Sequence, residues 1–96
     1  MAANWKVTSG TLTNTTAAIP ANARRRELVI SNNSDTVMTY SPDAGATATA
    51  SVGIAIPAGT ALRLGQGGEG QSGVAPGNAG TLFCAGTSKA YSYAEC

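Results

Sequence analysis

Histidine is absent from the 96-residue chain, and charge of either sign is scarce. Without histidine, the commonest general base and metal ligand, one chain cannot assemble a Ser/His/Asp or Cys/His nucleophilic site. Six Lys and Arg residues against five Asp and Glu residues give a formal net charge of +1. A nearly neutral domain has no general field that attracts nucleic acid or acidic lipid. The composition therefore predicts a protein that is not an enzyme, uses no cofactor and binds neither nucleic acid nor a membrane.

Large apolar side chains and long apolar runs are also scarce. No run approaches the ~18 residues that a membrane-spanning helix needs. The first residues, Met-Ala-Ala-Asn-Trp-Lys, lack the charged-then-apolar profile of a signal peptide, so we expect no secretion. Alanine supplies much of the 43% hydrophobic content, which leaves a thin core for a chain of this length. We therefore expect stability to depend on neighbours in an oligomer or a larger assembly.

The central stretch, residues 24–40, has the pattern of two strands joined by a polar turn. Leu28 and Ile30 alternate with Glu27 and Val29, which is the period of a strand with one buried face. Asn, Ser and Asp follow at 32–35, and such residues hydrogen-bond their own backbone in turns. β-forming residues then resume, so the stretch predicts an antiparallel hairpin.

Further short β-prone segments, separated by Gly, Pro and polar turn residues, flank this hairpin. They lie at residues 11–18, 53–56, 61–64, 81–85 and 90–95, and we expect the last two to form a second hairpin. About seven short strands with no helical period predict the all-β class. The architecture that we expect is a small antiparallel β-sandwich or barrel, jelly-roll-like in topology.

The sequence predicts one domain with an N-terminal arm and one long loop. We expect residues 19–96 to form the β-sandwich, and residues 1–18 to supply an N-terminal arm and an edge strand. Residues 65–80 include seven glycines and can bury almost nothing. Such a stretch predicts a flexible loop that becomes ordered against a neighbour.

The chain has two cysteines, Cys84 and Cys96. If the last two strands form a tight hairpin, Cys96 lies ~16 Å along the strand from the position that faces Cys84. A disulfide requires Cα atoms within about 7 Å, so we expect no bridge within the chain. Cys84 is then a small core residue and Cys96 a free terminal thiol, with pairing between chains as the alternative.

Two features are candidates for partner binding: Trp5, and the run Arg24, Arg25 and Arg26. Aromatic residues are enriched at interfaces, so Trp5 packs either on a neighbouring subunit or over this chain's own core. The arginines form either a solvated strand start or an anchor for acidic residues on a partner. Nucleic acid is disfavoured because no second basic cluster and no interleaved aromatic pair accompanies them. We identify no catalytic or metal-binding residues.

Several pieces of the sequence, taken in order, resemble a set of small bacteriophage structural proteins. These pieces are R-x-L-x-I-x-N-N at 26–33, V-x-x-Y at 37–40, G-I-x-I-P-A-G at 53–59, L-x-L at 62–64, and the closing strands at 81–95. The resemblance implies a β-sandwich virion protein made in the host cytoplasm. It further implies a cement, or decoration, protein bound to the major capsid protein on the capsid surface as a homotrimer. It supplies no catalytic residues, and Trp5 lies outside it.

Two alternatives remain beside the cement protein. A tail, neck or fibre component would share the fold and the resemblance. A carbohydrate-binding β-module would use Tyr40, Tyr91 and Tyr93 as stacking platforms for sugar rings.

Overall fold

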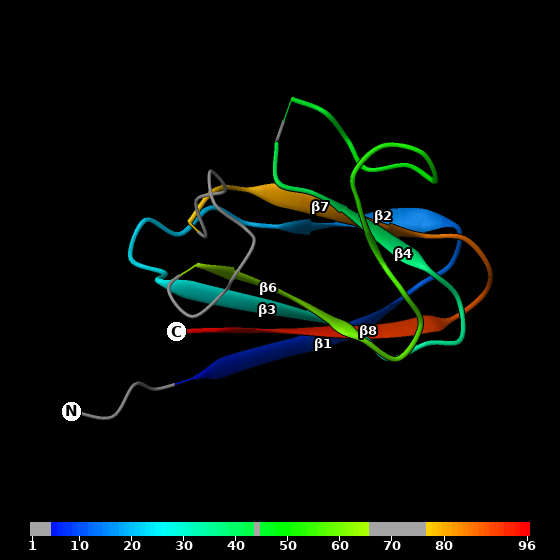
Figure 1. Cartoon of the computed structure of the whole chain (residues 1–96), viewed down its shortest axis with the longest axis horizontal. Coiled ribbons are helices and arrows are strands. Elements are labelled where there is room, and N and C mark those ends of the chain that lie inside the picture. The colour runs from blue at the N-terminus through cyan, green and yellow to red at the C-terminus, as the bar shows by residue number, and fades with distance from the viewer. Residues whose placement is uncertain (1–4, 44, 66–76) are drawn as a thin grey trace.

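The computed structural model describes residues 5–43, 45–65 and 77–96, and these residues form strands and no helix. The strands build two four-stranded antiparallel sheets that face each other as two layers (Figure 1). This confirms the predicted all-β sandwich, with eight strands rather than about seven. The strands are β1 (Lys6–Leu12), β2 (Thr15–Ile19), β3 (Glu27–Asn32), β4 (Met38–Ser41), β5 (Ile54–Ile56), β6 (Ala61–Gly65), β7 (Gly80–Cys84) and β8 (Lys89–Glu95).

The topology is that of a jelly roll. Sheet A has the order β1-β8-β3-β6, and sheet B has the order β2-β7-β4-β5. The antiparallel pairs are nested, with β1 beside β8, β2 beside β7, β3 beside β6 and β4 beside β5. The chain therefore has the topology of one long hairpin that is folded over on itself. This is the eight-stranded, two-sheet arrangement of jelly rolls.

Both predicted hairpins are wrong, although the strands that compose them are present. β3 and β4 lie in different sheets, and so do β7 and β8. Alternation along a strand shows which face is buried, but it does not show which strand lies alongside. A short polar turn can reverse the chain within one sheet or carry it across the ~10 Å between two packed sheets.

The core lies between the two sheets and takes side chains from every strand. Its buried members are Leu12, Ile19, Leu28, Ile30, Met38, Tyr40, Ile56, Leu62, Leu64, Leu82, Cys84 and Tyr93. The inward face predicted for β3 is thereby confirmed, and β6 shows the same alternation, with Arg63 exposed between two buried leucines. Both cysteines are free, as expected, with Cys84 buried in sheet B and Cys96 beyond the end of β8 in sheet A.

The N-terminal segment is part of the sandwich. The single strand predicted over residues 11–18 is wrong, because a turn divides it between β1 and β2. Asn14 in that turn has a φ of 51°, a left-handed conformation that asparagine tolerates well. Leu12 and Ile19 reach the core from these two strands, so the expected division after residue 18 falls inside β2. Residues 1–4 of the expected arm and 66–76 of the glycine-rich loop lie outside the described residues.

The outer faces of the two sheets differ. The connection between β4 and β5 folds over sheet B (Figure 1), where Thr39 Oγ1 donates to Thr49 O at 2.6 Å and Ala48 N donates to Thr81 Oγ1 at 2.8 Å. Ala48 is buried there, and all of β4 is buried as well. On sheet A, by contrast, the described residues leave Val7 67% exposed.

A buried side chain, Asn32, directs the chain from β3 in sheet A to β4 in sheet B. Its Nδ2 donates to Thr36 O and to Ile56 O, both at 2.8 Å, and its Oδ1 accepts from Ser34 N at 3.0 Å and Ser34 Oγ at 2.7 Å. The backbone carbonyl of Asn32 accepts from Gly59 N at 2.9 Å. Asn32 therefore joins the crossover after β3 to the crossover after β5.

Asn32→Ala should destabilise the fold by about 2–4 kcal/mol, because the carbonyls of Thr36 and Ile56 lose the Asn32 Nδ2 donor and Ser34 loses the Oδ1 acceptor. The free energy of unfolding from urea denaturation measures this loss. Asn33→Ala is the matched control, since the exposed Asn33 side chain donates only to Ser92 Oγ at 3.2 Å. That control should change stability by less than about 0.5 kcal/mol. Equal effects of the two substitutions would contradict the role given to Asn32.

Candidate interaction site

The structure brings Trp5 and the arginine run to the same end of sheet A. Trp5 precedes Lys6, and Lys6 lies opposite Glu95 in the β1–β8 register. On the other side of β8, Arg26 N donates to Cys96 O at 2.8 Å. The start of β1, the end of β8 and the approach to β3 therefore lie side by side. We call this region, with Trp5, Lys6, Arg24, Arg25, Arg26 and Glu95, the basic end.

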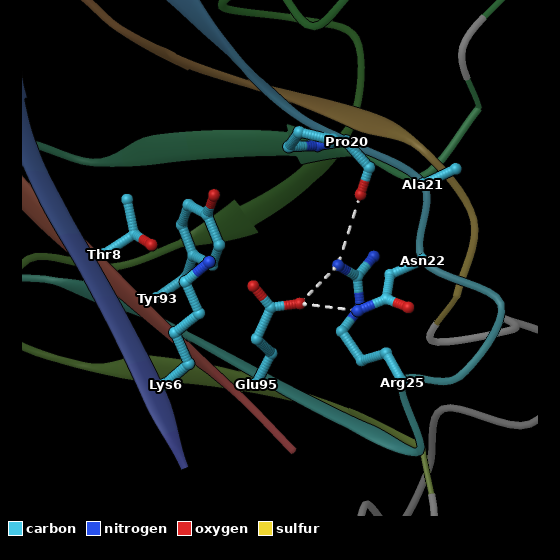
Figure 2. A pocket seen from close by; sticks show the side chains of 8 residues that line it. All are labelled: Lys6, Thr8, Pro20, Ala21, Asn22, Arg25, Tyr93 and Glu95. Atoms are coloured by element: carbon cyan, nitrogen blue, oxygen red, sulfur yellow. Dashed lines mark hydrogen bonds and ion pairs between the residues drawn. The ribbon is translucent and has the colours of Figure 1, made fainter.

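A groove opens at the basic end, between the edges of the two sheets (Figure 2). One cavity of about 230 Å³ runs from Lys6 and Thr8 on β1 to the connection after β2. A second cavity of about 240 Å³ shares Lys6, Arg25 and Glu95 with it and extends to Arg24. Figure 2 shows Arg25 and Glu95 pointing toward one another across the groove.

Arg25 is buried, which the sequence did not indicate. Its side chain is 1% exposed, and Nη1 lies 3.0 Å from Glu95 Oε1. The same guanidinium donates to Pro20 O at 3.2 Å and to Asn78 O at 3.1 Å. The prediction of a solvated strand start is therefore wrong for Arg25. The countercharge that permits this burial lies far along the chain and reaches Arg25 only through the β3–β8 pairing.

Glu95 is ionised more readily than an ordinary glutamate. Partial burial by itself raises the pKa of Glu95, but hydrogen bonds from Arg25 and Asn22, with the positive charges of Arg25 and Lys6, outweigh it and hold that pKa below its ordinary value. A carboxylate held in this state by a buried guanidinium is a poor proton donor near neutral pH. The pair therefore fits a structural clamp at the groove better than acid–base chemistry.

The other predicted contact residues lie on the surface. Trp5 is 47% exposed and lies outside the core cluster, so it does not cover this chain's own core. Arg24 and Arg26 are exposed on either side of the buried Arg25. Partner binding by these residues stays a prediction. Lys6 is an exposed cation of the same end that sequence analysis missed, because only its pairing with Glu95 places it near the arginines.

Two of the three tyrosines predicted as stacking platforms for sugars are buried. Tyr40 is 1% exposed and Tyr93 is 8% exposed, and Tyr91 packs partly buried against the core. A sugar ring stacks on an accessible aromatic face, which the buried Tyr40 and Tyr93 do not offer; sugar binding at Tyr91 stays a prediction. Tyr40 and Tyr93 serve instead as large side chains that fill a thin core.

Two further features bear on the kind of site that the described residues can form. No group of three His, Cys, Asp or Glu residues gathers among them to hold a metal ion. Within that same part of the chain, no helix is long and apolar enough to cross a membrane.

Glu95→Gln should lower the free energy of unfolding at pH 7 by about 1.5–3 kcal/mol, because the buried Arg25 loses its ionised partner. The native pKa of Glu95 lies below its ordinary 4.5, so the carboxylate contributes fully above that value. Its contribution is lost as the pH falls through the native pKa. Denaturation of both proteins between pH 7 and pH 2 should show the gap between them closing in acid. A gap that is constant with pH would contradict the clamp.

Comparison of the chain with protein-family models, with curated proteins and with solved structures found no match.

Proposed function

We propose that the chain is a non-enzymatic structural protein of a bacteriophage virion, a cement protein that binds the major capsid protein on the outer capsid surface as a homotrimer. The observation that carries this proposal is the basic end. An exposed tryptophan and exposed cations from distant parts of the sequence meet there, beside a groove. Cementing requires complementary surface rather than catalytic groups, and binding energy usually concentrates in a few Trp, Tyr or Arg anchors.

Charge pairing within the chain concentrates its positive charge at this end. Arg25, Arg63 and Lys89 each form an ion pair, with Glu95, Glu27 and Asp35 respectively. Among the described residues, the cations outside these pairs are Lys6, Arg24 and Arg26, and all of them belong to the basic end. A nearly neutral chain thus presents a local cationic surface, and this supports an acidic protein surface as its partner.

The fold and the resemblance narrow the class of function. Jelly rolls occur in viral capsid proteins, in lectins and in cupins, so topology alone does not select among them. The buried tyrosines disfavour the lectin option. The similarity of residues 26–33, 53–59 and 81–95 to small phage structural proteins then favours the virion. A tail, neck or fibre protein would use the same basic end on a different partner.

The triple substitution Trp5→Ala, Arg24→Ala and Arg26→Ala should weaken binding to capsids that lack the protein by about 30-fold or more, because it removes a hot-spot aromatic and two steering charges. Co-sedimentation with purified capsids at several salt concentrations measures this. Wild-type affinity should fall as salt rises, and the variant should lose most of that salt dependence.

Arg63→Ala is the matched control, because Arg63 is an exposed arginine on β6, at the opposite edge of sheet A from β1. It should bind capsids like the wild type. Unchanged binding by the triple variant would overturn the assignment of the contact to the basic end. Binding to isolated tails but not to capsids would instead favour the tail component.

The homotrimer should appear as three times the 9.5 kDa chain mass in light scattering of the purified protein. The triple variant should keep that mass if the basic end meets the capsid rather than a neighbouring copy. A stable monomer at every concentration would remove the trimer from the proposal and leave capsid binding to be judged separately.

A further inference from the structure

β1 is a long, unprotected edge of sheet A. It is seven residues long and, among the residues that the structure describes, pairs with β8 on one side only. Its register with β8 is one-to-one from Lys6 to Leu12, so no bulge interrupts the edge. In Figure 1 the strand forms the boundary of the lower layer. A free edge of this kind presents unpaired N–H and C=O groups to any other strand.

The remaining sheet edges carry the features that prevent edge-to-edge pairing. β2 ends at Ile19 and Pro20 follows it, and β5 has three residues and is followed by Pro57. β6 carries Arg63, whose side chain is 54% exposed and paired with Glu27. Short strands, proline and charge are the usual protections of an edge. Residues 7–12 of β1 contain neither a charged residue nor a proline.

We infer that β1 pairs antiparallel with β1 of a second copy across a two-fold axis near Ser9, joining two A sheets into one continuous sheet. This inference is independent of the proposed function. A second copy fits because a strand edge is recognised by another strand, and a two-fold axis lets the same strand serve on both sides.

A register centred on Ser9 places compatible side chains of the two copies opposite each other. It places Val7 opposite Thr11 of the partner subunit, so side chains from the outer face of one copy lie beside side chains from the outer face of the other. It also places Lys6 opposite Leu12 of the partner subunit. The two lysines, and with them the two basic ends, lie at opposite ends of the paired strands. A parallel pairing would bring these like charges together.

The outer face of sheet A suits such a continuation. On β8 the neighbours of Val7, Ser9 and Thr11 are Ala94, Ser92 and Ala90. These side chains are small and uncharged, so they would not repel the same face of a second copy. A single strand pair is small against the ~800 Å² per partner of a stable interface, so we expect association in the range of about 1 μM to 1 mM. Such a two-fold contact leaves a three-fold contact elsewhere possible.

Ser9→Lys tests the inference, because it sets two like charges directly opposite each other at the axis while changing an exposed side chain. Sedimentation across a range of concentrations should show that the wild type dimerises. The dissociation constant of the variant dimer should be at least tenfold higher. Thr16→Lys is the matched control, since Thr16 is an exposed residue of β2, the edge strand of sheet B. It should associate like the wild type, and both variants should keep the wild-type melting temperature within a few degrees.

A cross-linking experiment locates the contact. In a Cys96→Ser background, Ser9→Cys treated with a short bifunctional thiol reagent should give covalent dimers, and Thr16→Cys should give few. Equal cross-linking at both positions, or equal association of Ser9→Lys and wild type, would overturn β1 pairing. A wild type that stays monomeric at millimolar concentration would overturn it too. A trimer insensitive to Ser9→Lys would overturn the pairing and leave the cement proposal standing.

Discussion

The buried amide of Asn32 is the contact on which the architecture of this chain depends. It donates to the carbonyl of Thr36 in the crossover after β3 and to that of Ile56 at the end of β5, and it accepts from Ser34 in the turn that carries β3 into β4. A buried polar side chain costs free energy wherever its partners are missing. In the observed crossover both the amide nitrogen and the amide oxygen of Asn32 have partners.

The nested strand pairing that follows from these crossovers also assembles the basic end. Because β8 lies between β1 and β3, the start of the first strand, the end of the last strand and the arginine run become neighbours. Arg25 then finds Glu95 at 3.0 Å and is buried, while Arg24 and Arg26 remain outside. One internal ion pair thus orients the connection after β2 and leaves the flanking cations to solvent or to a partner.

The two proposed contacts use different features of the same sheet. At the basic end, a tryptophan and a local excess of positive charge favour an acidic protein surface. Along residues 7–12 of β1, an uncharged edge favours another uncharged strand, and the two-fold arrangement keeps the basic ends apart. A thin core is consistent with both proposals, because contacts between chains would add to the free energy that packing supplies within one chain.

Sequence alone determined the class and most of the faces. Alternation predicted that Leu28 and Ile30 point inward, and turn residues located most of the strands. Only the tertiary structure decided which strands pair, that Asn32 carries the chain between sheets rather than along one, and that Arg25 is internal. The reason is physical. Side-chain alternation and turn chemistry act between residues close in sequence, whereas strand partners and buried countercharges come from residues that meet only when the chain is folded.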